Sequence, residues 1–197
     1  MVYIPYDKFA RRAKQEGYRA RSSYKLLDLQ RKFGLIKRGD RVLDLGAAPG
    51  SWLQVAASIV GERGKVVGVD LAPIKPLGLA NVVAFQKDIL EEDFVGFLAR
   101  QGHKIFDAVL SDVAPNTSGI KERDQALSHD LSLRVLGLAS QLLRKGGTMV
   151  IKVFEGPNTS QLMKETEKHF SSVKLVKPEA STKGSKELYL IARNYKS

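Results

Sequence analysis

The order of apolar and polar residues along the chain predicts alternating strands and helices. From Arg41 onward, short apolar runs suited to strands buried on both faces alternate with longer segments whose apolar residues recur every three or four positions. We expect strands at 41–45, 65–70, 81–85, 105–111, 147–153, 172–177 and 187–193, and helices at 51–60, 90–100, 124–144 and 158–169. Gly146 and Gly147 mark a turn into the fifth strand.

These elements define an open α/β sheet. No helix separates the last two strands, so we expect them to pair as a hairpin with the final strand antiparallel. Five parallel strands with crossover helices, together with this hairpin, give a seven-stranded, doubly wound sheet. The length suits a single domain over 1–197, in which 1–40 form a basic extension with a first helix and 41–197 form the core. Leu26, Leu29 and Phe33 recur at helical spacing and should bury that helix against the sheet.

The segment from Val42 to Trp52 is typical of a nucleotide-binding α/β domain. A short apolar strand carrying Asp44 leads into the turn Gly46-Ala47-Ala48-Pro49-Gly50, and a helix follows. The glycines allow the backbone to pass close to a ligand, because no Cβ stands in the way. A structural turn without a ligand is the alternative interpretation.

The residues of this turn narrow the choice of ligand. A dinucleotide site requires G-x-G-x-x-G, but Ala48 occupies the second glycine position, and a phosphate-binding loop ends in Gly-Lys-Ser/Thr, which this turn lacks. Asp44 disfavours a phosphate and favours a cation. Asp70, at the end of the second strand, has the spacing at which an acid binds ribose hydroxyls. S-adenosylmethionine combines an adenosine with an ammonium and a sulfonium, so we predict it as the cofactor.

Polar residues also follow the other predicted strands. Ligands of open α/β sheets bind beyond the carboxyl ends of the parallel strands, and the antiparallel last strand begins at that same edge. We therefore expect one site that brings together Asp44, Asp70, Asp88, Ser111, Asp112, Lys152 and Glu187.

The composition indicates a polyanionic partner. Lys and Arg number 32 against 21 Asp and Glu, a net charge of +11, which suits nucleic acid or an anionic membrane surface. Residues 3–24 interleave basic side chains with tyrosines, which favours phosphate contacts and base stacking over a merely solvated helix. That segment, with Lys25, supplies Tyr6, Lys8, Arg11, Arg12, Lys14, Tyr18, Arg19, Arg21, Tyr24 and Lys25.

Several classes of protein are disfavoured. The absence of cysteine excludes disulfides, zinc fingers and thiol catalysis, and we predict no metal site. No apolar run approaches the roughly 18 residues of a membrane span, and the first residues lack the apolar centre of a signal peptide. We expect a cytoplasmic protein without a membrane partner.

The segment Asp112-Val113-Ala114-Pro115-Asn116 bears on the reaction. It lacks the aromatic residue that would stack on a base in an Asp-Pro-Pro-Tyr motif for amino-group methylation. Together with Lys152, it resembles the FtsJ/RrmJ family of ribose 2′-O-methyltransferases. The resemblance covers almost the whole chain, although Ser51 stands where many relatives have a second glycine. Its matching segments are 19–26, 44–50, 111–116, 151–154 and 185–189.

The resemblance implies a Rossmann-like S-adenosylmethionine-dependent methyltransferase fold and a defined set of site residues. The Lys-Asp-Lys-Glu catalytic tetrad of the family falls on Lys25, Asp112, Lys152 and Glu187. The implied cofactor contacts are Gly50, Trp52, Asp70, Asp88 and Asp112, with Asp88 at the adenine amino group; the turn adds Asp44, Gly46, Ala47 and Pro49. Lys152 either takes the proton of the ribose hydroxyl as a neutral base or, charged, orients the oxygen.

The resemblance also implies a substrate. We expect methylation of a ribose, that of a uridine, in large-subunit ribosomal RNA, by a monomeric protein. A transfer RNA methyltransferase of the same family and a non-catalytic RNA-binding assembly factor are the alternatives. A small-molecule methyltransferase is disfavoured by the basic segment.

Overall fold

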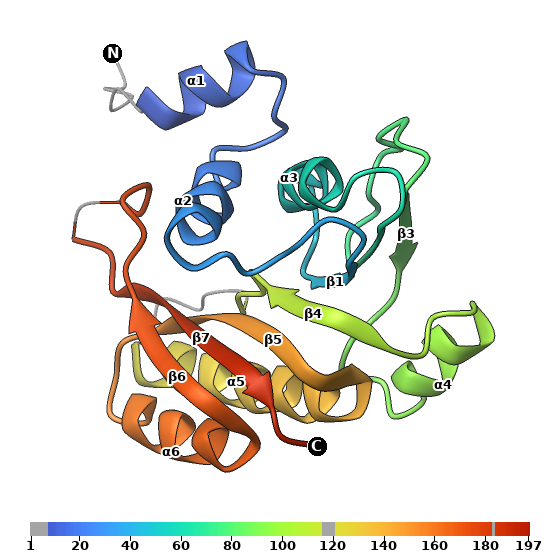
Figure 1. Ribbon diagram of the computed structural model, residues 1–197. Coiled ribbons are helices and arrows are strands. Elements are labelled where there is room, and N and C mark those ends of the chain that lie inside the picture. Colours follow the sequence, from blue (N-terminus) through green and yellow to red (C-terminus); the bar gives the residue numbers. More distant parts are fainter. Residues whose placement is uncertain (1–7, 116–120, 183) are drawn as a thin grey trace.

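The computed structural model describes residues 8–115, 121–182 and 184–197, in which one mixed sheet forms the centre of the molecule. Its strands run in the order β3-β2-β1-β4-β5-β7-β6 (Figure 1), and the pairs that involve β7 are antiparallel while the others are parallel. The predicted seven strands and the antiparallel last strand are therefore confirmed. The strands are β1 Arg41–Leu45, β2 Lys65–Asp70, β3 Val82–Gln86, β4 Phe106–Ser111, β5 Leu143–Phe154, β6 Phe170–Val176 and β7 Glu187–Tyr195.

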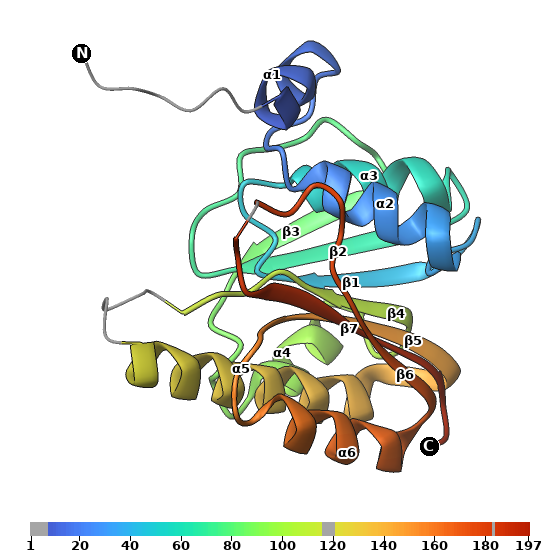
Figure 2. The ribbon, with the colours of Figure 1, turned by 90° about the vertical axis from the view of Figure 1, so that its left-hand side faces the viewer.

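Helices cover both faces of the sheet. In Figures 1 and 2, α2 and α3 lie on one face and α4, α5 and α6 on the other, while α1 stands beyond α2, away from the strands. This is the arrangement expected of crossover connections in a doubly wound sheet. The helices are α1 Lys8–Gln15, α2 Ser23–Phe33, α3 Ser51–Val60, α4 Phe94–Arg100, α5 Lys121–Leu142 and α6 Thr159–His169.

Each face of the sheet has its own apolar core. Successive strand residues point to opposite faces, so Val42 packs with Leu26 and Leu29 of α2, whereas Leu43 packs with Leu138 of α5. All five side chains are fully buried. The helix predicted near the end of the basic extension is thus a part of the core.

The predicted helix 90–100 begins only at Phe94. The backbone carbonyls of Ile89 and Glu91 accept hydrogen bonds of 2.8 Å from the guanidinium of Arg134, on α5. These bonds hold the carbonyls in a turn, in which the Glu91 carbonyl also accepts from the amide of Phe94 at 3.2 Å. The segment after β3, which carries Asp88, is therefore an ordered loop instead of a first helical turn.

The fifth strand is longer than predicted. It begins at Leu143 and includes Gly146 and Gly147, which the sequence suggested as a turn. Its pairing with β4 shifts register between Phe106 and Ala108, and Gly146 adopts a φ of +76° that favours glycine. The two glycines therefore lie within β5, near the position where its pairing with β4 becomes irregular. The other predicted elements agree with the structure to within about three residues at each end.

Helices α2 and α3 are joined at their N-terminal ends. The hydroxyls of Ser22 and Ser51 lie 2.7 Å apart, and the indole Nε1 of Trp52 donates to the Ser22 carbonyl at 2.8 Å. Ser22 occupies the N-cap position of α2, but its hydroxyl makes no capping bond. Ser51 is buried and connects the two helices.

We predict that Ser51→Ala lowers the free energy of unfolding by about 1 kcal/mol, because it leaves the Ser22 hydroxyl without this partner. Urea denaturation measures the change. The matched control is Ser58→Ala on the exposed side of α3, which should be neutral or slightly stabilising because alanine is the better helix former. Equal effects of the two substitutions would contradict the prediction.

Candidate active site

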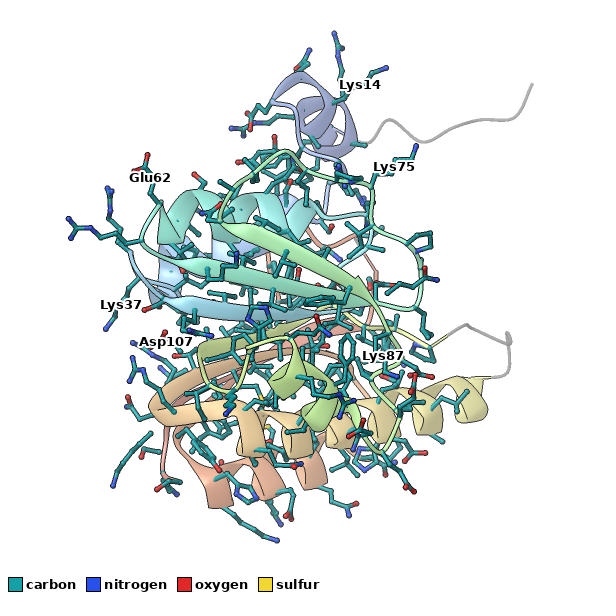
Figure 3. The ribbon with its side chains drawn as sticks, turned by 90° about the vertical axis from the view of Figure 1, so that its right-hand side faces the viewer. Lys14, Lys37, Glu62, Lys75, Lys87 and Asp107 are labelled. Carbon is teal, nitrogen blue, oxygen red and sulfur yellow. The ribbon has the colours of Figure 1, made fainter. Side chains whose placement is uncertain are left out.

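The polar residues predicted to meet at the carboxyl ends of the strands do meet there. Asp44 and Asp70 lie at the ends of β1 and β2, Asp112 directly follows β4, Lys152 lies near the end of β5, and Glu187 begins β7. Figure 3 shows this edge on the side of Lys75 and Lys87, opposite the edge marked by Lys37, Glu62 and Asp107. The convergence of these residues is confirmed.

A cavity of about 590 Å³ opens at this edge, between the loops that follow β1, β2, β3 and β4. Gly46, Asp70, Asp88 and Asp112 line it, as predicted for cofactor contacts. The sequence analysis missed the apolar wall and the loop residue Ala48. That wall consists of Leu71, Ile89, Leu90, Leu127 and Leu131, and the high exposure of Leu71, Leu90 and Leu127 is explained by their position around an open cavity.

The loop after β1 does not offer its first N–H groups to a ligand. The amides of Gly46 and Ala47 both donate to the carbonyl of Val69, and the amide of Ala48 donates to the Asp70 carboxylate at 2.8 Å. A phosphate site requires such amides to point at the anion. The cavity is therefore unsuited to a phosphate at this loop, in agreement with the interpretation of the sequence.

Gly46 is required by a close approach of two loops. Its φ is +76°, and a Cβ at this position would lie 2.5 Å from the Cγ2 atom of Val113. No side chain fits in that space. The loop after β1 and the loop after β4 consequently touch beside Asp112.

Asp70 and Asp88 are both held by backbone amides. The two oxygens of Asp70 accept from Ala48 and Ala72, each at 2.8 Å, and one oxygen of Asp88 accepts from Leu90 at 2.8 Å. These bonds orient the carboxylates at the wall of the cavity while leaving lone pairs for a ligand.

Asp44 has an unusual environment. Its side chain is fully buried, and neither oxygen has a hydrogen-bond partner among the described residues. Burial, followed by the charges of Asp112 and Asp70, raises the pKa of this carboxyl well above its usual value. Asp44 thus lies behind the cavity, as a buried acid beneath the loop.

Four other predicted cofactor contacts do not line the cavity. Ala47 and Trp52 are buried, and the Trp52 ring lies 5.8 Å from that of Tyr189. Gly50 is the N-cap of α3 with a φ of +106°, and the carbonyl of Pro49 accepts a hydrogen bond from Arg19. Direct contact of these four residues with a cofactor stays a prediction.

The four predicted catalytic residues form two ion pairs. Lys152 Nζ lies 3.1 Å from Asp112 Oδ1 and also donates to the Asp112 carbonyl. Lys25 Nζ lies 2.7 and 2.8 Å from the two oxygens of Glu187. Both lysines are less than a tenth exposed, so pairing offsets the cost of removing their charges from water.

Tyr189 connects the two pairs, and the sequence analysis did not identify it. Its hydroxyl donates to Asp112 Oδ1 at 2.7 Å, and Lys25 Nζ lies 5.9 Å from the centre of its ring. Burial, followed by the charges of Asp112 and Glu187, raises the pKa of Tyr189 well above its usual value. Tyr189 pairs with Lys152 across β5 and β7 and follows Glu187 by two, which places all three on one face of the sheet. That period-two spacing was the available signal.

Several side chains of the basic segment make contacts within the protein and are less available to RNA than the composition suggests. Tyr24 is buried, Arg12 pairs with Glu16, and Arg21 donates to Thr182, so these side chains serve contacts within the protein. The expectation that a base stacks on Tyr24 is therefore wrong, because the ring of Tyr24 is buried. The prediction for Tyr6 lies outside the described residues. The exposed basic side chains of α1 are Lys8, Arg11, Arg12 and Lys14, and Figure 3 shows Lys14 pointing away from the protein.

We predict that Asp44→Asn changes the pH dependence of stability. Because its pKa is raised in the folded state, Asp44 holds its proton more tightly there than in the unfolded chain, so stability falls as pH rises above the ordinary aspartate value. The asparagine variant should lose this dependence, with a difference of at most about 1.4 kcal/mol per pH unit. Urea denaturation from about pH 4 to about pH 8 measures it.

The control for this prediction is Asp130→Asn, since Asp130 is exposed on α5. It should follow the wild-type curve. A wild-type curve parallel to that of Asp44→Asn would show that Asp44 has the same pKa in both states.

Comparison with known sequences identifies relatives along almost the whole chain. The family model described as FtsJ-like methyltransferase matches residues 18–195. A protein of Methanothermobacter thermautotrophicus named ribosomal RNA large subunit methyltransferase E is 45% identical over 190 residues, which cover 96% of this chain and 90% of the relative. A protein of the same name from Bdellovibrio bacteriovorus is 42% identical over 197 residues and matches over the full length of both chains.

Solved structures show the same fold. A ribosomal RNA methyltransferase structure from Plasmodium falciparum superimposes with a TM-score of 0.78 at 29% identity, covering 90% of this chain and 98% of that one. Aeropyrum pernix fibrillarin, in complex with natively bound S-adenosylmethionine, superimposes with a TM-score of 0.60 at 20% identity. The match covers 89% of this chain and 75% of that one, and it supports the fold alone. With the family model matched from 18 to 195, this chain belongs to the FtsJ-like methyltransferase family.

Proposed function

We propose that this protein transfers a methyl group from S-adenosylmethionine to the 2′ oxygen of a ribose in large-subunit ribosomal RNA, with a uridine as the target nucleotide. The observation that carries the proposal is the position of Asp112, which lines the acidic cavity and pairs with Lys152. A cofactor cavity and a candidate acceptor site therefore share one side chain. The relatives named as large-subunit methyltransferases support the RNA substrate.

The residues of the cavity fit S-adenosylmethionine. Asp70 and Asp88 offer carboxylate oxygens for ribose hydroxyls and for the adenine amino group, and the leucine and isoleucine wall suits the faces of the adenine ring. Lys87, the one lysine among the described residues of the lining, forms an ion pair with Glu91, so this part of the lining keeps an acidic character suited to a cationic ligand. When bound, the cofactor supplies an electrophilic methyl group on a sulfonium.

Lys152 acts at the ribose. Its ammonium is held by the carboxylate and the carbonyl of Asp112, which fixes its direction at the edge where the cavity opens. A group held in place before substrate arrives loses little freedom when it binds. We assign to Lys152 two roles: it orients the 2′ hydroxyl, and once it has given a proton to solvent its neutral amine accepts the proton of the hydroxyl as the oxygen takes up the methyl group.

Lys25 and Glu187 shape the acceptor side of the site. Their ion pair joins α2 to the start of β7, and Ser181 Oγ donates to Glu187 at 3.2 Å. Because α2 follows the basic segment, the pair ties the proposed RNA-contacting region to the catalytic edge. We keep a monomer and the cytoplasm as expectations. Among the helices of the described residues, none has the length and apolar character needed to cross a membrane.

The proposal is tested by incubating the protein with labelled S-adenosylmethionine and separated RNA fractions, including large ribosomal subunits, ribosomal RNA and transfer RNA. Label in large-subunit RNA, located by primer extension at low nucleotide concentration, supports it. Label in transfer RNA alone would assign the alternative substrate, and RNA binding without label would leave a non-catalytic RNA-binding protein.

We predict that Lys152→Ala lowers methylation by about 10²-fold or more, with nearly normal binding of cofactor and RNA, because it removes the group that acts on the hydroxyl. Single-turnover methylation and separate binding assays measure this. Lys152→Arg tests whether residue 152 accepts a proton, since arginine keeps the positive charge but cannot give up its own proton in this pH range. We expect it to be inactive too.

The contrary outcome is a structural ion pair. In that case Lys152→Ala would leave Asp112 unpaired and lower the free energy of unfolding by several kcal/mol, and activity would fall only with the amount of folded protein. Near wild-type turnover of folded Lys152→Arg would exclude proton acceptance by Lys152.

We predict that the exposed basic residues of α1 contact RNA phosphates. Replacing Arg11 and Lys14 with alanine should weaken RNA binding and reduce its salt dependence, by a slope of roughly 0.7 to 0.9 for each lost contact. Filter binding over a series of KCl concentrations measures the slope. The control is Lys37→Ala at the opposite edge of the sheet, which should leave the slope unchanged. Equal salt slopes for the wild type, the variant with Arg11 and Lys14 replaced, and Lys37→Ala would show that α1 is a solvated helix.

A further inference from the structure

Arg19 makes an unusual number of contacts with the backbone of the cofactor loops. Its guanidinium donates to the carbonyls of Pro49 at 2.8 Å, Lys75 at 2.6 Å and Pro76 at 2.7 Å. Its own backbone amide donates to the side chain of Gln54 on α3 at 2.9 Å. Both ends of this residue are therefore attached to the protein.

The three carbonyls belong to two different walls of the cavity region. Pro49 lies in the loop after β1, whereas Lys75 and Pro76 lie in the loop after β2, whose first residues, Leu71 and Ala72, line the cavity. Figure 3 shows this second loop on the outer side of the sheet, at Lys75. Arg19 thus bridges the loops that flank Asp70.

The loop after β2 has few bonds of its own. It contains two prolines, which lack an N–H donor, and it forms no regular structure between Leu71 and Ala80. Most of its residues are exposed, and its apolar packing is limited to Ile74 and Leu77, which lie against the core. Asp70 holds its beginning through the amide of Ala72, and Arg19 holds its middle.

The chemistry of arginine suits this role. A guanidinium presents five donors in one plane, and Arg19 directs both hydrogens of Nη1 and one of Nη2 at carbonyls. Both hydrogens of Nη1 are consequently engaged within the protein, and two of the five donors remain. This separates Arg19 from Arg11 and Lys14, although all three belong to the same basic segment.

We propose that Arg19 is a positioning residue for the cofactor: it joins the loops after β1 and β2 and so shapes the ribose side of the cavity, without contacting RNA phosphates. The identity of the cofactor rests on the proposed function. The cofactor loops and the basic segment are then mechanically connected, because Arg19 lies between α1 and α2.

The test compares Arg19→Ala, Arg19→Lys and the control Arg11→Ala with the wild type. Calorimetric titration with S-adenosylmethionine gives cofactor affinity, steady-state kinetics separate KM for the cofactor from kcat, and filter binding gives the salt slope for RNA. Hydrogen exchange of residues 71–80 reports directly on the loop.

For both Arg19 variants we expect cofactor affinity to fall about tenfold or more. The KM for the cofactor should rise while kcat at saturating cofactor stays close to wild type, exchange at 71–80 should accelerate, and the salt slope should not change. Arg19→Lys keeps the charge but not the planar fork, so it decides the matter if Arg19→Ala does not fold. Arg11→Ala should show the reverse pattern, with a lower salt slope and unchanged cofactor affinity.

Unchanged cofactor affinity in folded Arg19→Lys would overturn the inference, and so would a salt slope reduced as much as in Arg11→Ala. Failure of the proposed function itself is distinguishable, because the wild type would then neither bind S-adenosylmethionine nor methylate RNA.

Discussion

The carboxylate of Asp112 is the constraint on which the rest of the site depends. One of its oxygens accepts the Tyr189 hydroxyl and pairs with Lys152, while the side chain also lines the cavity after β1 and β2. The residue after it, Val113, fills the space that Gly46 leaves open. Strands β4, β5 and β7 and the first loop are therefore held in one arrangement by contacts that meet at a single residue. The proposed cofactor and acceptor sites therefore share this residue.

Four of the charges at this edge are balanced in two ion pairs. Pairing of Lys152 with Asp112 and of Lys25 with Glu187 offsets the cost of burial, and the hydroxyls of Tyr189 and Ser181 donate to the same carboxylate oxygens, Asp112 Oδ1 and Glu187 Oε1. Asp44 has no such partner among the described residues, and its raised pKa reflects this. The carboxylates that line the cavity are those of Asp70, Asp88 and Asp112, whereas Asp44 lies outside the lining.

Arginines hold the loops that form the cavity walls. Arg134 binds the carbonyls after β3, and Arg19 binds those after β1 and β2, so segments without regular structure acquire a defined shape. The protein thus uses part of its basic composition inside its own fold. The excess positive charge indicates a polyanionic partner, and the exposed basic residues of α1 are among those available to it.

The sequence by itself determined the seven strands, their antiparallel last member and the gathering of acids at one edge, because periodicity and the rule for strand ends are local or topological properties. It placed Lys25, Asp112, Lys152 and Glu187 together through resemblance. Only the tertiary structure decided which lysine pairs with which acid, that Tyr189 connects them, that Trp52 packs behind the loop, and that Arg19 and Arg134 bind backbone carbonyls. Those contacts join residues far apart in sequence, so their partners are selected by distance and burial, which no local pattern encodes.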